Sequence, residues 1–237
     1  GDSNANHFTE AVVGAGESLG RPVWVFTASS CPLISGVALF KDSRIVAGCE
    51  DYVSYTLNWL ENMPPGIVFV AAVDLYWSES KYTVESSDST MSTNADQKSA
   101  MLAQGLTASI SALRSAGHQV VLIQSVPTYK DSVPLWDPRL CSVPLILNRE
   151  CYREVQIGHV DDLQRLSRNT IDKVAEDTHS SVLDLRDWFC DAGVCSTDTP
   201  SAWQYRDATH ITVAASKALA PRFVAAVENS ALAQRGD

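Results

Sequence analysis

The chain has 237 residues with an ordinary apolar content, enough to bury a substantial core in one or two domains. Its formal net charge of -10 and its lack of a Lys/Arg cluster argue against nucleic acid as a partner, because phosphate contacts need clustered cations. The sequence shows neither an apolar run as long as a membrane span nor a recognisable signal peptide.

The first part of the chain alternates predicted helices with predicted apolar strands. In chain order these are helix 8–19, strand 22–26, helix 49–63 and strand 67–73. Gly20 is a typical stop for the first helix, and Pro64-Pro65-Gly66 breaks the chain after the second. Residues 78–97 are rich in Ser, Thr and Asp, and we expect them to form a long surface loop.

The alternation continues to the end of the chain. The predicted elements are helix 98–115, strand 119–124, helix 160–177, strand 181–185 and a terminal helix within 210–228, which Pro221 should kink or divide. Residues 127–155 carry prolines and a cysteine pair and are predicted to be irregular. Short apolar strands between helices predict an α/β three-layer sandwich, with a parallel sheet flanked by helices. Without a repeat, a linker or a break in composition, residues 1–237 are expected to form one domain.

The six cysteines fall into three close pairs: Cys31 and Cys49, Cys141 and Cys151, and Cys190 and Cys195. This spacing favours three local disulfides, and disulfides imply an oxidising compartment. The alternatives are a metal site, which the absence of a C-x-x-C motif disfavours, and buried free thiols. We predict no metal.

The two ends of the chain hold the parts of a serine-based catalytic site. A serine hydroxyl needs a base, usually an imidazole, and the imidazole needs an acceptor that orients it. Ser3 supplies the hydroxyl, and His210 and Asp207 supply the imidazole and the carboxylate within one short turn. Taken singly, Asp2-Ser3 is typical of a helix N-cap and His210 of a surface histidine. Taken together, they predict catalysis that needs no cofactor.

The residues around this site resemble a known family. The segment Gly1-Asp2-Ser3-Asn4-Ala5-Asn6-His7 resembles the first block of the SGNH, or GDSL, hydrolases, and Tyr205-Arg206-Asp207-Ala208-Thr209-His210-Ile211-Thr212 resembles the last. The segments Ala28-Ser29-Ser30-Cys31-Pro32-Leu33 and Val70-Ala71-Ala72-Val73-Asp74-Leu75-Tyr76, with the cysteine pairs, narrow the resemblance. It points to the extracytoplasmic SGNH domain fused to the C-terminus of acyltransferase family three membrane proteins, and it covers essentially the whole chain.

The resemblance implies the SGNH-hydrolase fold, which is flavodoxin-like, and an extracytoplasmic O-acyltransferase. The acyl group, expected to be acetyl, would pass through an acyl-Ser3 intermediate to a hydroxyl of a cell-envelope glycan or glycolipid. A fused or associated membrane acyltransferase domain would deliver the acyl group and tether this domain outside the cytoplasm. The alternatives are a carbohydrate esterase or deacetylase with the same triad, and a non-catalytic glycan-binding module.

The resemblance also suggests which residues line the site. The expected oxyanion donors are the backbone N–H of Ser3 and one near Ser30, where the family usually has glycine. Asp74 stands where the family has an Asn donor, and an ionised Asp cannot donate a hydrogen bond. We therefore expect Asp74 to bind the acceptor, to cap a turn or to point elsewhere, and Asn4 to line the pocket. Candidates for stacking on a sugar ring are Tyr76, Trp77 and Trp203.

One departure from the family concerns the start of the chain. In SGNH enzymes the nucleophile follows a strand that lies centrally in the sheet, whereas Gly1 is the first residue here. A missing central strand would leave costly unpaired backbone groups on its neighbours. We therefore expect either that residues precede Gly1 in the natural protein or that the sheet is built differently.

Overall fold

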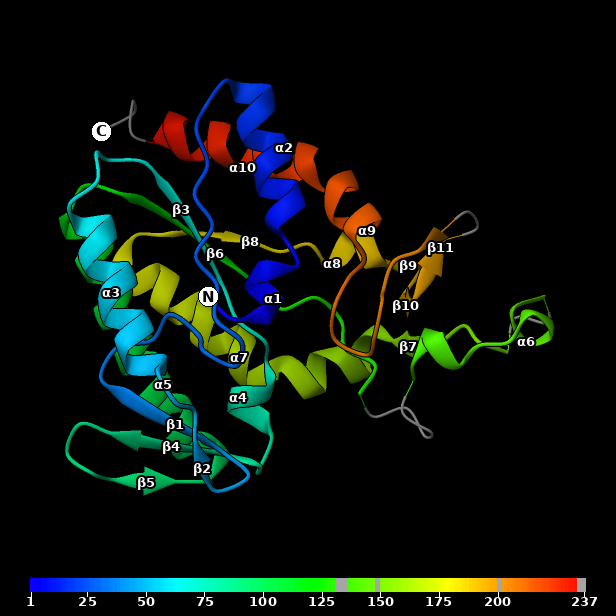
Figure 1. Ribbon diagram of the computed structural model, residues 1–237, viewed down its shortest axis with the longest axis horizontal. Coiled ribbons are helices and arrows are strands. Elements are labelled where there is room, and N and C mark those ends of the chain that lie inside the picture. The colour runs from blue at the N-terminus through cyan, green and yellow to red at the C-terminus, as the bar shows by residue number, and fades with distance from the viewer. Residues whose placement is uncertain (131–135, 148–149, 200–201, 234–237) are drawn as a thin grey trace.

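The computed structural model describes residues 1–130, 136–147, 150–199 and 202–233 (Figure 1). The helices are α1 (Ser3–Asn6), α2 (Thr9–Leu19), α3 (Cys49–Glu61), α4 (Leu75–Ser78), α5 (Ala95–Ser115), the 3-10 helix η1 (Pro138–Leu140), α6 (Val143–Leu147), α7 (Ile157–Thr178), α8 (Arg186–Phe189), α9 (Val213–Ala218) and α10 (Ala220–Ala233). The strands are β1 (Val37–Lys41), β2 (Arg44–Ile45), β3 (Ile67–Ala71), β4 (Tyr82–Ser86), β5 (Met91–Ser92), β6 (Gln119–Ile123), β7 (Glu154–Gln156), β8 (Ser181–Leu183), β9 (Cys190–Asp191), β10 (Val194–Ser196), β11 (Asp198–Thr199) and β12 (Ala202–Trp203).

A parallel sheet lies at the centre, with strand order β3-β6-β8 among the described residues. Successive residues of a strand face opposite sides, and the two sides of this sheet have separate cores. Val68 and Val70 of β3 pack into the core beneath α3, α5 and α7, whereas Phe69 and Ala71 pack into the core beneath α2, α9 and α10. Helices therefore cover both faces of the sheet, and the predicted α/β sandwich is confirmed (Figure 1).

The main error of the sequence analysis concerns residues 78–97, which are not a surface loop. They contain β4, β5 and the first turn of α5, and β4 pairs antiparallel with β1 in a second sheet of order β2-β1-β4-β5. Tyr82 and Val84 are buried on the face turned towards α5. Only these alternate positions are apolar, so the strand is hidden in a composition typical of a loop.

The predicted strand 22–26 is also wrong. Residues 21–28 run without helix or strand, and Trp24 and Val25 are about half exposed, at 55% and 44%. Trp24 and Phe26 of this run pack on Trp59 of α3, with ring centroids 5.9 and 4.7 Å apart. At the other end of the chain, the terminal helix divides at Leu219, and Pro221 lies in the first turn of α10, where its missing N–H costs nothing.

The six cysteines form three local disulfides in the structure, Cys31–Cys49, Cys141–Cys151 and Cys190–Cys195. The first ties the turn after residue 28 to the start of α3. The predicted irregular region 127–155 holds only η1, α6 and β7 among its described residues, and 131–135 and 148–149 lie outside them. Within the described residues, no helix combines the length and the hydropathy needed to cross a bilayer.

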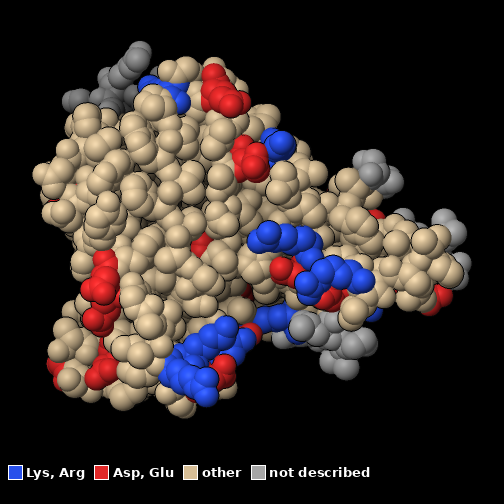
Figure 2. All heavy atoms as spheres, viewed as in Figure 1, with Lys and Arg blue, Asp and Glu red and all other residues tan. Residues whose placement is uncertain are grey.

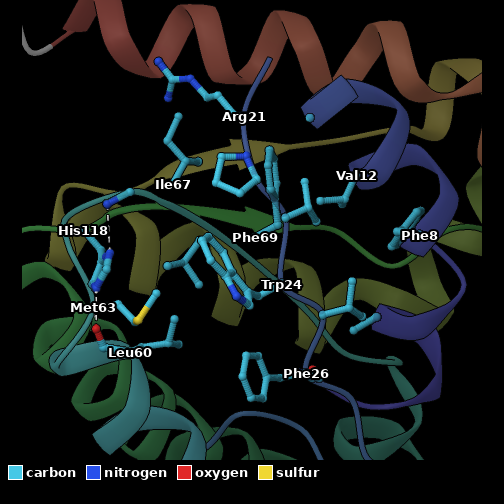
Figure 3. A pocket seen from close by; sticks show the side chains of 18 of the residues that line it. Phe8, Val12, Arg21, Trp24, Phe26, Leu60, Met63, Ile67, Phe69 and His118 are labelled. Atoms are coloured by element: carbon cyan, nitrogen blue, oxygen red, sulfur yellow. Dashed lines mark hydrogen bonds between the residues drawn. The ribbon is translucent and has the colours of Figure 1, made fainter. Parts of the chain in front are cut away.

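An apolar groove of about 470 Å³ lies between residues 21–28 and the outer edge of β3 (Figure 3). Helix α2 lines one side of the groove, for example through Val12, and helix α3 lines the other, for example through Trp59. Figure 2 shows almost no charged side chains over residues 21–28, while Lys and Arg gather with acidic residues over the lower and right-hand part of the same face.

Candidate active site

The short helix α1 holds Ser3 at the carboxyl end of β3. Asp2 is its N-cap, and its Oδ1 accepts hydrogen bonds from the backbone N–H groups of Asn4 (2.8 Å) and Ala5 (3.2 Å). Its Oδ2 accepts a third bond, at 3.0 Å, from the N–H of Val73, just past β3. Because the Asp2 side chain is fully buried, these bonds fix the turn that presents Ser3.

The segment from Tyr205 to Ile211 folds back on itself and presents His210. Tyr205 and Ile211 form an antiparallel bridge, and the Arg206 N–H donates to the His210 carbonyl at 2.9 Å. Asp207 Oδ1 accepts from the backbone N–H groups of Thr209 and His210, both at 2.9 Å, so the carboxylate shapes the turn that carries its partner. The turn is also anchored to the core by a 2.7 Å bond from the Tyr129 N–H to the Ala208 carbonyl.

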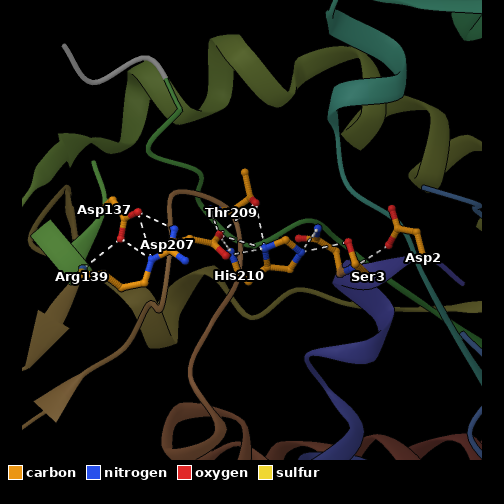
Figure 4. A network of polar contacts seen from close by, with 8 residues as sticks. Asp2, Ser3, Asp137, Arg139, Asp207, Thr209 and His210 are labelled. Atoms are coloured by element: carbon orange, nitrogen blue, oxygen red, sulfur yellow. Dashed lines mark hydrogen bonds and ion pairs between the residues drawn. The ribbon is translucent and has the colours of Figure 1, made fainter. Parts of the chain in front are cut away.

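These two segments, about two hundred residues apart in the sequence, bring Ser3, His210 and Asp207 into one line (Figure 4). Ser3 Oγ lies 2.9 Å from His210 Nε2, and His210 Nδ1 lies 2.9 Å from each carboxylate oxygen of Asp207. The carboxylate can only accept, so Nδ1 carries the proton and Nε2 is left to accept from the Ser3 hydroxyl. This is the tautomer that a general base beside a serine requires.

Asp207 is ionised in this arrangement. Burial alone would raise the pKa of Asp207, but the hydrogen bonds from the His210 ring and the Thr209 backbone N–H outweigh it and hold the pKa well below its ordinary value. A carboxylate in this state stabilises the imidazolium that forms when His210 takes a proton.

Two neighbours complete the hydrogen bonding around the imidazole. Thr209 Oγ1 lies 3.2 Å from Asp207 Oδ1 and 3.1 Å from His210 Nδ1, and Asn4 Nδ2 lies 3.5 Å from His210 Nε2. Asn4 was predicted to line the pocket, and its buried side chain lies beside the imidazole. Thr209 was not predicted to have a role, although its place between Asp207 and His210 in the sequence is a signal that could have identified it.

His7 lies behind the imidazole. Its ring centroid is 6.1 Å from that of His210, edge to face, and neither ring nitrogen of His7 has a hydrogen-bond partner among the described residues. Burial, reinforced by the charges of His210 and Arg206, holds the pKa of His7 well below its ordinary value. His7 is therefore a neutral, buried wall of the site.

The turn that carries Ser30 lies alongside the start of the chain. The Ala28 N–H donates to the Gly1 carbonyl at 3.0 Å, and the Cys31 N–H closes the turn on Ala28. Ser30 has a φ of 59°, in the left-handed region that glycine adopts more readily. A backbone of this shape is compatible with the glycine that the resemblance implies at this position in the family.

The other residues proposed for substrate binding lie further from the open surface. Asp74 is fully buried, its Oδ2 is 3.9 Å from Lys130 Nζ, and its side chain makes no capping hydrogen bond to α4. Tyr76 and Trp77 are core residues, which corrects the suggestion that they stack on a sugar. Trp203 is half-buried and stacks on Tyr152, with ring centroids 4.7 Å apart.

In chemical terms, the site is a hydrogen-bonded chain from the Asp207 carboxylate through the His210 imidazole to the Ser3 hydroxyl. No group of three or more His, Cys, Asp or Glu residues able to hold a metal occurs in the described part of the chain. Beyond Asp207, Arg139 and Asp137 form an ion pair with Nη2 and Oδ2 2.6 Å apart (Figure 4). The geometry suits nucleophilic attack by Ser3 on an acyl carbon.

Comparisons with known proteins agree with this architecture. A family model described as "SGNH domain (fused to AT3 domains)" matches residues 1–225. The chain therefore belongs to this family of SGNH domains, as the resemblance predicted. No curated protein sequence matches the chain.

Two solved structures share the fold. One is the periplasmic domain of a lipopolysaccharide acetyltransferase from Salmonella ser. Paratyphi A, with 14% identity, a TM-score of 0.61, and coverage of 94% of this chain and 79% of that one. The other is a protein from Slackia heliotrinireducens assigned as an SGNH hydrolase, with 14% identity, a TM-score of 0.57, and coverage of 95% of both chains. At this identity the matches establish the fold.

Proposed function

We propose that this domain is an extracytoplasmic O-acyltransferase, expected to transfer acetyl, that modifies a hydroxyl of a cell-envelope glycan or glycolipid through an acyl-Ser3 intermediate. The observation that carries the proposal is the 2.9 Å contact between Ser3 Oγ and His210 Nε2, with Asp207 behind it. Membership of a family of SGNH domains fused to AT3 domains supports transfer from a membrane partner. The similar fold of a lipopolysaccharide acetyltransferase domain supports a glycolipid acceptor.

The reaction runs in two steps. His210 Nε2 takes the Ser3 proton as Oγ attacks the acyl carbonyl, and the resulting imidazolium gives its proton to the departing donor group. An acceptor hydroxyl then attacks the acyl-Ser3 carbonyl and gives its proton to Nε2, and collapse of the second tetrahedral intermediate returns that proton to Ser3 Oγ. Asp207 remains ionised throughout and stabilises the imidazolium in each step.

The negative oxygen of each tetrahedral intermediate needs donors aimed at it. The Ser3 backbone N–H is one proposed donor, since none of the described residues accepts a hydrogen bond from it. A backbone N–H of the turn that carries Ser30 is the other. Loss of one such donor typically costs about 3 kcal/mol of transition-state stabilisation.

The three disulfides fit an oxidising compartment outside the cytoplasm. A membrane acyltransferase domain, either fused to this domain or associated with it, would deliver the acyl group to Ser3. In this arrangement Ser3 acts as the relay between a membrane-bound donor and an external acceptor.

Covalent labelling tests the nucleophile. A fluorophosphonate probe should label the protein on Ser3, and mass spectrometry of the digested protein should place the adduct on the peptide that contains it. Ser3→Ala should remove the label while leaving the circular dichroism spectrum unchanged. Labelling of Ser3→Ala at the full rate would overturn the proposal, and absence of labelling in both proteins would favour a glycan-binding module.

Product analysis separates transfer from hydrolysis. With an activated acetyl ester and a panel of envelope glycans, a transferase yields O-acetylated glycan in excess of free acetate, and the yield rises with acceptor concentration. Release of acetate alone, at a rate independent of the acceptor, would assign an esterase with the same triad.

A further inference from the structure

The turn that carries His210 also carries an arginine directly opposite it. The Arg206 N–H donates to the His210 carbonyl at 2.9 Å, one position further into the turn than the bridge between Tyr205 and Ile211. Successive residues of a strand face opposite sides, and opposite residues of an antiparallel pair face the same side. Tyr205 and Ile211 are buried in the core, so Arg206 and His210 extend from the other face. Arg206 is therefore the cross-strand neighbour of the proposed general base.

The guanidinium of Arg206 carries an uncompensated charge at this position. The residue is exposed, and its side chain forms no ion pair or hydrogen bond with any residue that the structure describes. Arg139, which lies beyond Asp207, differs in this respect: its Nη2 is 2.6 Å from Asp137 Oδ2, and its Nε is 2.9 Å from Asp137 Oδ1 (Figure 4). The charge of Arg139 is thus neutralised by a nearby carboxylate, whereas that of Arg206 is available to a ligand.

The charge of Arg206 also acts on the interior of the site. After burial and the charge of His210, it is a further cause that holds the pKa of His7 below its ordinary value. The chain as a whole has a formal net charge of -10, so its overall field repels anions. An unpaired guanidinium beside the imidazole gives an anionic group a local attraction against that field.

The position of Arg206 determines which part of a substrate it meets. In the second step of the proposed reaction, the acceptor hydroxyl must come within hydrogen-bonding distance of His210 Nε2 to give up its proton. Groups next to that hydroxyl then lie beside the turn that carries His210 and Arg206. The acyl oxygen is directed instead to the proposed backbone donors at Ser3 and near Ser30.

We infer that Arg206 selects acceptors that carry a phosphate or carboxylate group close to the hydroxyl that is acylated. The inference rests on the proposed function for the kind of acceptor, a glycan or glycolipid, but binding of an anionic sugar does not depend on turnover. A guanidinium is always charged, and its parallel N–H donors match the paired oxygens of phosphates and carboxylates. Arg206 is thus a specificity-determining residue and takes no part in the proton transfers.

Binding of matched sugars tests the inference without turnover. Glucose 6-phosphate and glucose differ only in the phosphate, and glucuronate offers a carboxylate at the same carbon. In the Ser3→Ala protein, which cannot form the acyl intermediate, both anionic sugars should bind about tenfold more tightly than glucose, because charge-assisted hydrogen bonds add to their affinity. With Arg206→Gln added, the affinities should agree within about twofold, and Arg206→Lys should keep part of the difference because it retains the charge without the fork. NMR titration at constant ionic strength measures the dissociation constants.

Two control variants remove the same charge elsewhere. Arg139→Gln removes the arginine that is paired with Asp137, and Arg165→Gln removes an exposed arginine of α7. Both should keep the preference for the anionic sugars, and circular dichroism checks that every variant is folded. Equal affinities for the anionic and neutral sugars before Arg206 is replaced would overturn the inference, as would an equal loss of preference in all the arginine variants.

Turnover measurements decide whether the anionic group belongs to the acceptor or to the acyl donor. With a neutral activated acetyl ester as donor, Arg206→Gln should raise the KM for glucose 6-phosphate about tenfold and change the KM for glucose little. If Arg206→Gln instead slows acylation of Ser3 by acetyl phosphate and leaves the preference for the anionic sugars intact, the anion belongs to the donor and the inference is wrong. If no donor acylates Ser3, the proposed function fails, while the sugar titrations still decide the role of Arg206.

Discussion

The polar site and the apolar groove meet at the first three residues, and they differ in what holds their residues in place. On the site side, Asp2 accepts a hydrogen bond from the Val73 N–H just past β3, and Ser3 contacts His210 in the segment after Tyr205. On the groove side, residues 21–28 and β3 face each other across a largely apolar space lined by α2 and α3. Short turns shaped by hydrogen bonds to nearby backbone groups thus position the catalytic side chains, whereas the groove depends on packing between segments distant in the sequence.

The largest effect should come from the orienting carboxylate on the site side. Asp207→Asn removes the charge that holds the Nδ1 proton and is expected to lower the rate of Ser3 acylation by about 10⁴-fold, while the thermal midpoint changes little. Stopped-flow acylation with an activated acetyl ester measures this rate. A loss of only a few-fold would mean that the line of Ser3, His210 and Asp207 is structural.

A matched control is Asp137→Asn, which removes a neighbouring carboxylate of the ion pair with Arg139 and leaves the imidazole contacts intact. We expect less than a tenfold change in acylation from it. Equal losses of acylation rate in the two variants would mean that Asp207→Asn acts through the overall negative charge near the site and not through its contact with His210.

The next effect concerns the groove side, where Cys31–Cys49 ties the turn beside Gly1 to α3. It closes a loop with a sequence separation of 18, and its replacement by two alanines should cost about 3 kcal/mol of unfolding free energy. Replacement of Cys190–Cys195, with a separation of 5, should cost about 2 kcal/mol and leave the groove unchanged. Urea titration measures both.

The first pair should also change acylation, because the turn carries the proposed second oxyanion donor. If the two double variants lose stability equally and acylate Ser3 at the same rate, the disulfide next to Ser30 has no special part in the site.

In the 237-residue chain taken by itself, the buried ammonium of Gly1 should add a pH dependence of stability between about pH 6 and 8. Its pKa falls from 8.0 in the unfolded chain to about 6 in the folded protein, so the unfolded state binds more protons between these values. Stability should therefore rise with pH across this window, by about 2–3 kcal/mol in all. His7, whose folded pKa is also depressed, contributes a rise that is complete once its ordinary value of 6.5 is passed.

Urea titrations between pH 6.5 and 8 isolate the amine. The same chain with Gly-Ser-Gly-Ser-Gly joined to Gly1 should lose this slope, because the buried nitrogen is then an amide. A slope that persists in the extended chain would show that another group is responsible.

The same contrast explains what the sequence predicted and what it missed. The parallel strands β3, β6 and β8 were predicted because each is a short run with a strong apolar content, and the sandwich followed from their alternation with helices. Ser3, Asp207 and His210 were predicted because each lies in a short block, and the bonds of Asp2 and Asp207 to nearby backbone groups shape the turns locally. Such features need only a few neighbouring residues.

The errors have the opposite origin. β4 is held by pairing with β1, about forty residues earlier, and its polar side chains conceal an alternation that only the partner strand reveals. Residues 22–26 have the composition of a strand, but among the described residues they pair with no strand, so composition alone gave the wrong state. The burial of Asp74 and the contact of Thr209 with His210 likewise depend on packing between distant segments.

The smallest expected effect tests how tightly the two regions fit where they meet. Gly1→Ala would place a methyl group 2.2 Å from the Ala71 carbonyl oxygen and 2.6 Å from the Ala5 Cβ, so either β3 or α1 must shift. We expect a loss of about 1–3 kcal/mol in unfolding free energy, together with slower acylation because α1 carries Ser3. The control is Gly158→Ala in α7, which meets nothing within 4 Å and should stabilise the protein by up to about 1 kcal/mol. If Gly1→Ala proves as harmless as the control, Gly1 is not held tightly between β3 and α1, and the packing around it does not set the position of Ser3.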